Sequence, residues 1–208
     1  FLQELIKSSG ETIVNRYSRQ IVFALYAGVT TRHFSQDVVK LFTRAKQIAA
    51  DTSKKPDQLR RQELCDCVTA ALFAVFEPRL KESLKTPTHG NVLLQMVLSG
   101  CCPNVVAQIK TVITPQVLAE AAPRTFMKRW LKRSTGPEQH SLLDHLEPLS
   151  TLLSSEAGFI LSAAVEGDQS VRDRLATAIT KLPSMTESAT SLADLINRVN
   201  AGLPVHPQ

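Results

Sequence analysis

A run of basic residues between positions 124 and 133 is the part of this sequence best suited to bind a charged ligand. The segment RTFMKRWLKR holds five Lys and Arg residues and no Asp or Glu. Arg124, Lys128 and Lys132 follow at intervals of four, so they lie along one face of a helix. Such a strip can bind phosphates, because each neutralised phosphate releases condensed counterions. A merely solvated helix face is the alternative interpretation.

The basic charge of the whole chain falls into two blocks. Residues 1–61 hold 11 Lys+Arg against 5 Asp+Glu, a net of +6, and residues 124–133 form the second block. Residues 134–208 instead hold 4 Lys+Arg against 9 Asp+Glu, a net of −5. This clustering, more than the overall net charge of +5, indicates a phosphate-binding surface.

Residue types that could support catalysis or bind a metal ion are present, but their spacing does not favour either. His89 near Cys101 and Cys102, and His140 at helical spacing from Asp144, both lack an identifiable third orienting group. The cysteines occur as CDC and CC, which do not match the CxxC spacing of a zinc knuckle. We therefore expect no enzymatic activity, no cofactor and no metal ion, and interpret the cysteines as thiols of an intracellular protein.

The elements that position the basic residues are predicted to be helices. Apolar residues recur at intervals of four along residues 13–25 and at intervals of three and four along residues 64–75. Thr114 before Pro115, Ser141 and Ser188 mark helix starts. Helix ends in a left-handed conformation are predicted at Gly28, Gly100, Gly167 and Gly202. About ten helices and an all-α fold result, with no segment long and apolar enough for a membrane span.

One helical pattern, a small or polar residue followed by an apolar helix, recurs along the chain. Aligning Ser18, Gly90, Arg124 and Gly158 gives spacings of 72, 34 and 34 residues, the first being twice 36. This period predicts an α-solenoid of helical repeats over residues 1–208, with a frayed tail at 203–208. A repeat near residue 54 is missing from the register. Chance similarity among short amphipathic helices is the alternative.

Several segments resemble a known family. NRYSRQIVFAL with the following HFSQDVVKLF, and RRQELCDCVTAALFAVFEPRL with HGNVLLQMVLSG, are similar to consecutive repeats of the nucleolar Puf-A-like Pumilio-repeat proteins. RTFMKRWLKR and SSEAGFILSAAVEGDQSVRDRLATAITKL resemble the C-terminal part of that family, the region often called the CPL domain. The resemblance is carried by diffuse patterns over most of the chain.

This resemblance implies that the chain is the C-terminal arm of a longer, right-handed Pumilio-type superhelix. It further implies a monomer that binds RNA, with DNA as an open alternative, largely without sequence preference. The implied setting is the nucleolus or nucleus, where the family acts in pre-rRNA processing and ribosome biogenesis alongside proteins of pre-ribosomal particles. No membrane partner is implied.

In sequence-specific Pumilio repeats, three side chains just after the small residue contact one base. The corresponding triplets here are Arg19, Gln20 and Phe23; Asn91, Val92 and Gln95; Thr125, Phe126 and Arg129; and Phe159, Ile160 and Ala163. Only the Asn91 and Gln95 pair could read a base edge. The last triplet is wholly apolar, which predicts that this repeat faces a neighbour or caps the stack.

Binding is therefore expected to depend on phosphates more than on base edges. The candidate nucleic-acid-binding residues are Arg16, Arg19, Gln20, Asn91, Gln95, Arg124, Lys128, Arg129, Lys132 and Arg133. Trp130 is interpreted as a core residue rather than a base-stacking platform. Basic residues at 54, 55, 60 and 61 could reach phosphates or simply be solvated. A HEAT-like or armadillo-like scaffold that binds an acidic protein partner is the alternative function.

Overall fold

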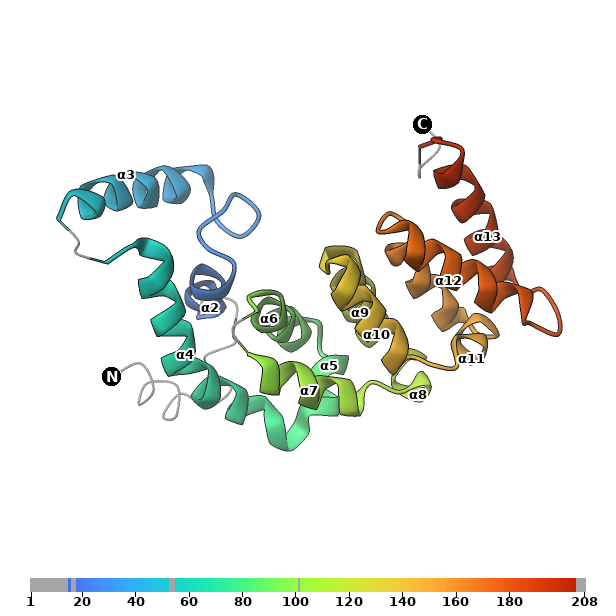
Figure 1. Cartoon of the computed structure of the whole chain (residues 1–208). Coiled ribbons are helices and arrows are strands. Elements are labelled where there is room, and N and C mark those ends of the chain that lie inside the picture. Colours follow the sequence, from blue (N-terminus) through green and yellow to red (C-terminus); the bar gives the residue numbers. More distant parts are fainter. Residues whose placement is uncertain (1–14, 16–17, 53–54, 101, 205–208) are drawn as a thin grey trace. The chain divides into compact units, whose positions relative to one another are not determined.

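Helices are the regular elements of the part of the chain that the structure describes. The computed structural model describes residue 15 and residues 18–52, 55–100 and 102–204. Within them lie twelve α-helices and two 3-10 helices (Figure 1). Their bounds are α2 Arg19–Tyr26, α3 Gln36–Thr52, α4 Asp57–Phe76, η2 Glu77–Arg79, α5 Leu80–Lys85, α6 Pro87–Leu98, α7 Pro103–Val112, α8 Pro115–Leu118, α9 Ala121–Arg133, α10 Gly136–His145, α11 Leu149–Leu153, η3 Glu156–Ala164, α12 Gln169–Thr180 and α13 Glu187–Asn200.

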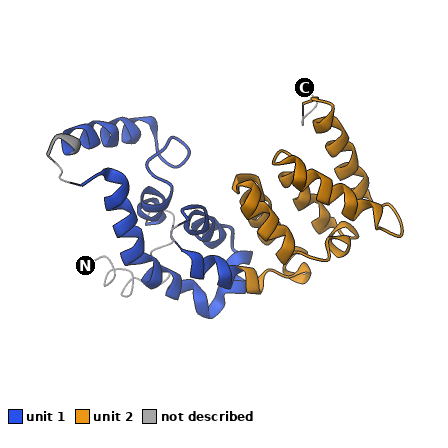
Figure 2. Cartoon of the chain, in the orientation of Figure 1, with its two compact units in different colours: residues 1–109 blue, residues 110–208 orange. Residues whose placement is uncertain are grey.

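The chain divides into two compact units, Phe1–Ile109 and Lys110–Gln208 (Figure 2). In the first unit, α2 packs against α6 and α4, and α5 packs against α6. In the second unit, η3 packs against α9, α11 and α13, while α12 packs against α11 and α13. The prediction of an all-α fold is confirmed for the described residues. The superhelix expected over residues 1–208 stays a prediction.

Helix α3 differs from its neighbours because none of its described side chains, at residues 36–49, is buried. Its sequence nevertheless has an apolar stripe, with Val38, Phe42, Ala45 and Ala49 at helical spacing. By contrast, α4 buries five side chains, including Leu72 and Phe76 at 1% exposure each. The first unit therefore combines a packed core with one amphipathic helix whose apolar stripe is uncovered.

The helices that begin the predicted repeats lie beside one another within each unit. In the first unit α2 packs directly against α6, although their aligned residues are 72 positions apart, and in the second α9 packs against η3. The segment between α2 and α6, which includes α3, therefore does not separate these two helices. This arrangement explains why the repeat expected near residue 54 is missing from the register.

Two side-chain hydrogen bonds join residues that lie about one repeat period apart in the sequence. Arg61 Nε donates to the Leu25 carbonyl at 2.7 Å, and Ser188 Oγ donates to the Leu153 carbonyl at 2.7 Å. The paired residues are 36 and 35 positions apart. Both bonds satisfy carbonyls near helix C-termini, which lack partners inside their own helices. The described residues form a helical repeat structure in which a later repeat completes an earlier one.

The predicted helix starts are confirmed only in part. Thr114 is the N-cap of α8, and its hydroxyl accepts from the Val117 amide at 3.4 Å. The prediction for Ser141 is wrong, because this residue lies inside α10, which already begins at Gly136. The last helix starts earlier than expected. Thr186 caps α13, and Ser188 is a buried residue of its first turn.

The predicted left-handed glycines are confirmed at three of four positions. Gly28, Gly100 and Gly202 have φ angles of 75°, 71° and 71°. Gly167 does not adopt a positive φ, and that prediction is wrong. A Cβ at position 167 would overlap the side-chain amide of Gln139, so a larger residue there would force this amide to move.

Candidate nucleic-acid interface

Helix α9 carries the predicted basic strip on the side opposite its buried residues. Phe126, Met127, Trp130 and Leu131 are all at most 4% exposed, so they fix the orientation of the helix. The indole Nε1 of Trp130 donates to Glu138 Oε1 at 3.0 Å. Trp130 has 0% exposure, so the prediction that it belongs to the core is confirmed.

Two of the three aligned cations on α9 are paired with carboxylates of the next repeat. Arg124 Nη1 lies 3.0 Å from Glu156 Oε2, and Lys132 Nζ lies 3.4 Å from Glu166 Oε1. Lys128 lies between them, is exposed, and has no ion pair within the described part of the chain. Glu156 at the start of η3 and Glu166 just after its end therefore reduce the positive charge of the strip at both ends and leave it concentrated at Lys128.

Lys128 and Lys132 line a recess of about 460 Å³ that lies wholly within the second unit. Helices α9, η3 and α13 form its walls. Phe159 also lines the recess and is 41% exposed, and the hydroxyl-bearing residues Ser162 and Ser191 add polar groups. The recess thus combines a cation, an accessible aromatic ring and hydroxyl groups, which suit a phosphate with an attached base.

Close packing of η3 positions Phe159 beside this cation. A Cβ at Gly158 would lie 2.7 Å from Ser188 Oγ and 3.0 Å from the Leu153 Cα atom, so only glycine fits. Ile160 and Ala163 are buried at 2% and 6% exposure. Phe159 and Ala163 both line the recess, and Phe159 is the member of the apolar triplet whose side chain is accessible there.

The prediction that this repeat faces a neighbour or caps the stack did not single out Phe159 as an accessible ring. Its exposure depends on how η3 packs against α9 and α13, which line the recess with it. The remaining predicted cations of α9, Arg129 and Arg133, are both exposed. They lie beside the aligned strip, as their spacing predicts.

The candidate residues of the first unit lie on α2 and α6, which pack together. Arg19 is half-buried and Gln20 is exposed, and Arg16 lies outside the described residues. Asn91 is half-buried, whereas Gln95 is only 6% exposed. The prediction that Asn91 and Gln95 form a base-reading pair is therefore corrected. The Gln95 side chain is buried, and of the two only Asn91 remains accessible.

Basic residues around the loop before α4 have structural partners. Lys55 Nζ lies 2.8 Å from Glu63 Oε1, and Lys54 lies outside the described residues. Arg61 donates through Nε to the Leu25 carbonyl and through Nη2 to the Tyr26 carbonyl. Arg61 therefore stabilises the C-terminal end of α2, where carbonyls lack helical partners.

The histidines considered for catalysis contact other groups. His89 packs edge-on against Phe76, with ring centroids 5.6 Å apart. His140 Nε2 lies 2.9 Å from Ser170 Oγ, and Asp144 instead forms an ion pair with Arg174 at 2.7 Å. Among the described residues, no group of three or more His, Cys, Asp or Glu side chains is arranged to hold a metal ion.

A charged cluster on α10 and α12 stabilises the second unit. Arg174 Nη2 donates to Glu147 Oε1 at 2.7 Å, and its Nη1 also contacts the His140 carbonyl at 3.3 Å. The hydrogen bond from Arg174 holds the pKa of Glu147 below its ordinary value. The amide of Ser170 likewise lowers the pKa of Asp168, the N-cap of α12. Both carboxylates contribute to helix packing and capping.

Repeated helix packing and a cationic recess define an all-helical repeat protein. The model of the CPL (NUC119) domain, a Pumilio-related family, matches residues 14–141, which is more than half of the chain. The chain belongs to this family. Neither the curated proteins nor the solved structures contain a match.

The family match corrects the position that the sequence resemblance gave to this domain. It includes RTFMKRWLKR but ends before the stretch at 154–182, which the resemblance also assigned to the CPL region. The match instead begins ahead of α2 and runs through α9 into α10. Across the described residues, no helix is both long and apolar enough to span a bilayer.

Proposed function

We propose that this chain is a non-catalytic nucleic-acid-binding module whose main ligand is single-stranded RNA. The observation that supports it best is the recess between α9, η3 and α13, where Lys128 has no carboxylate partner within the described residues and Phe159 is accessible. A lysine supplies charge for the phosphate, and an exposed aromatic ring supplies a face for a base. Stacking is tolerant of sequence because every base has a π-face.

Phosphate-directed binding fits the rest of the candidate surface better than base reading does. Gln95 is buried, so the pair expected to read a base edge is reduced to Asn91. The exposed cations Lys128, Arg129, Lys132 and Arg133 of α9 remain available to follow a nucleic-acid backbone. Membership of the CPL family supports a role with RNA. The finer proposal is pre-rRNA processing during ribosome biogenesis in the nucleolus or nucleus, next to proteins of pre-ribosomal particles.

The proposal is tested by binding to a labelled random single-stranded RNA across a salt series. The Lys128→Glu/Lys132→Glu variant should weaken binding by at least about tenfold and reduce the slope of log K against log salt by about 0.7 per lost phosphate contact. Lys181→Glu is the matched control, because Lys181 is exposed at the end of α12 and does not line the recess. No binding at low salt, or equal losses in both variants, would refute the proposal.

The aromatic contribution needs a separate variant. Phe159→Ala should lower RNA affinity by about 1–3 kcal/mol if one base stacks on this ring. Met185→Ala is the control, since Met185 is a large apolar residue with 56% exposure that does not line the recess. Single-stranded DNA of the same length, measured in parallel, determines whether the ribose 2′-hydroxyl contributes to binding.

A further inference from the structure

An apolar groove in the first unit lies between α2, α3 and α4. Its volume is about 530 Å³, and its lining includes Ile21 of α2, Phe42 of α3 and Leu64 of α4. These three side chains are 57%, 44% and 46% exposed. Single exposed apolar residues are common on proteins, but here three helices direct them into one groove. Contiguous apolar surface of this kind marks a binding site.

Helix α3 forms one wall of the groove without being packed itself. Phe42, Ala45 and Ala49 line the groove, yet no described side chain of α3 is buried. Helices in proteins owe most of their stability to the packing of an apolar face, because short isolated helices are marginal in water. A second helix laid along the groove would cover this face together with Ile21 and Leu64.

The charged residues of the groove favour an acidic occupant. Among the described residues, Lys46, Arg60 and Arg61 line it, against a single carboxylate, Asp57. Asp57 is shared, with Oδ2 lying 2.8 Å from Lys46 Nζ and Oδ1 lying 3.6 Å from Arg60 Nη2. The hydrogen bond from Lys46 lowers the pKa of Asp57, so this carboxylate is fully charged at neutral pH. Three cations against one anion leave an excess of two positive charges.

Among the described residues, neither arginine has a carboxylate partner other than Asp57. Arg61 donates to the backbone carbonyls of Leu25 and Tyr26, which are neutral acceptors. Arg60 has a buried Nε with no hydrogen-bond acceptor in the described part of the chain. An additional carboxylate beside these guanidinium groups would be favourable, because arginine binds carboxylates through charged hydrogen bonds.

From this geometry we infer that the groove between α2, α3 and α4 binds an amphipathic helix of a partner protein, with an apolar face and acidic flanks. The apolar face packs between Ile21, Phe42 and Leu64, and the acidic flank pairs with Lys46 and Arg60. This is recognition of a helix in a groove, in which residues at i, i+3, i+4 and i+7 provide the anchors. The site is on a different unit from the recess at Lys128 and does not depend on the proposed RNA binding.

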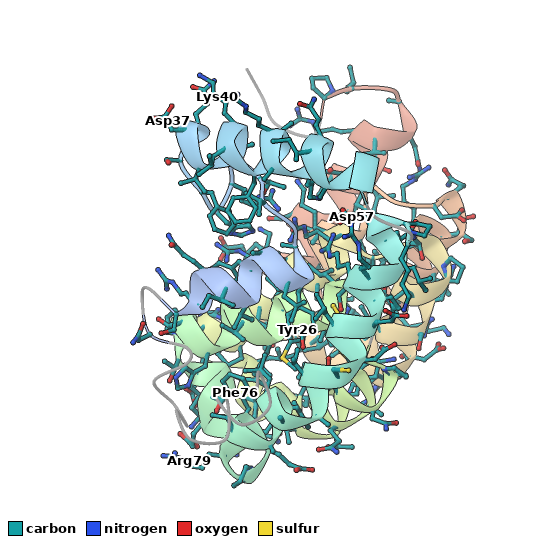
Figure 3. The ribbon with its side chains drawn as sticks, turned by 90° about the vertical axis from the view of Figure 1, so that its left-hand side faces the viewer. Tyr26, Asp37, Lys40, Asp57, Phe76 and Arg79 are labelled. Carbon is teal, nitrogen blue, oxygen red and sulfur yellow. The ribbon has the colours of Figure 1, made fainter. Side chains whose placement is uncertain are left out.

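Orientation of the charged residues supplies an internal control. Figure 3 shows Lys40 on the side of α3 that faces away from α2, and Asp57 at the start of α4. Lys40 is exposed and does not line the groove, whereas Lys46 does. Leu41 is 65% exposed and is likewise absent from the lining, although Phe42 beside it is present. Adjacent positions on one helix therefore separate groove effects from general changes in charge or hydrophobicity.

The test uses the full chain and a fluorescent synthetic helix of about 15 residues, long enough for four turns, with Leu at helical spacing and Glu on both flanks. A second peptide carries Lys in place of each Glu. The acidic peptide should bind at least about tenfold more tightly than the basic one. Phe42→Asp should weaken its binding at least about tenfold, with little change for Leu41→Asp. Lys46→Gln should weaken binding more than Lys40→Gln.

Other occupants give distinguishable results, and each overturns the inference. Equal binding of both peptides, or binding unaffected by Phe42→Asp, removes the groove as the site. Concentration-dependent dimers that Phe42→Asp abolishes would identify a second copy of the chain as the occupant. Peptide binding that appears only after Leu2→Asp and Leu5→Asp would identify the chain's own first residues. Loss of RNA affinity in Phe42→Asp, without peptide binding, would make the groove part of a nucleic-acid surface.

Discussion

Helices α3 and α9 have the same kind of sequence but different surroundings. Each has an apolar stripe and several basic residues. On α9 the stripe is buried, with Met127, Trp130 and Leu131 at 0% exposure, and the basic residues face outward. On α3 the stripe lines an open groove and no described side chain is buried. Amphipathic pattern alone therefore does not determine whether a helix stabilises the fold or offers a surface to a partner.

The largest difference is expected in stability. Met127→Ala should lower the free energy of unfolding by about 2–5 kcal/mol, because it leaves a cavity in a packed interior. Phe42→Ala should lower it by much less, since 44% of the Phe42 surface stays exposed in the unbound chain. Urea unfolding followed by circular dichroism measures both. Comparable losses would show that α3 is packed in solution and would remove the contrast between the two helices.

Replacing a glycine should destabilise each of the two units for a different physical reason. Gly158→Ala should cost about 1–3 kcal/mol, because the added methyl group meets Ser188 and the backbone of Leu153. It should also weaken RNA binding by displacing Phe159. Gly100→Ala should cost about 1 kcal/mol through its positive φ alone, since the space around it is open. Unfolding followed by the fluorescence of Trp130, in the second unit, should respond to Gly158→Ala; an unchanged midpoint would contradict the packing described for η3.

A smaller effect separates the units by their response to acid. The pKa of Glu147 is lowered in the folded chain, so its stabilising contribution is present above its ordinary value of 4.5 and is lost as pH falls through the folded pKa. Arg174→Ala should cost about 1–2 kcal/mol at neutral pH and make the second unit less sensitive to acid below that value. Trp130 fluorescence measured between neutral and acidic pH provides the test; an unchanged acid dependence would exclude this pair as the cause.

The smallest predicted change is a gain in binding. Glu166→Gln removes the partner of Lys132 and a negative charge from the recess, so RNA affinity should rise by about two- to threefold, the effect of a surface ion pair. Asp194→Asn, at an exposed residue of α13 outside the recess lining, is the control for net charge. A loss of affinity in Glu166→Gln would show that the Lys132 pair positions the recess rather than competing with RNA for it.

Local features of the fold were predictable from sequence, whereas pairings between repeats were not. The N-cap at Thr114 and the positive φ angles at Gly28 and Gly100 depend on adjacent residues. The burial of Trp130 follows from the periodicity of one helix. Ser141 failed as a start signal because the Thr135–Gly136–Pro137 sequence already begins α10, with proline near its first position.

Longer-range pairings explain what the sequence missed about the site. The sequence alone indicates that Arg124 and Lys132 are available cations, because their carboxylate partners Glu156 and Glu166 lie 32 and 34 residues later. The sequence did not distinguish Phe159 from the other apolar residues of its triplet, and its accessibility depends on how η3 packs against α9 and α13. Gln95 was predicted to contact a base, although its side chain is buried in the folded chain. Residue type and spacing indicate which faces can bind, and only the neighbouring repeat decides which of them remain open.

The carbonyl groups near the end of one repeat receive side chains from the next, and this has a consequence for synthesis on the ribosome. Arg61 reaches the carbonyl of Leu25, and Ser188 reaches that of Leu153, across 36 and 35 residues. A nascent chain that has just completed the earlier helix still lacks the donor for its end. The end of the earlier helix is therefore completed only after the next repeat has emerged, and until then water or a chaperone can bind its last carbonyls.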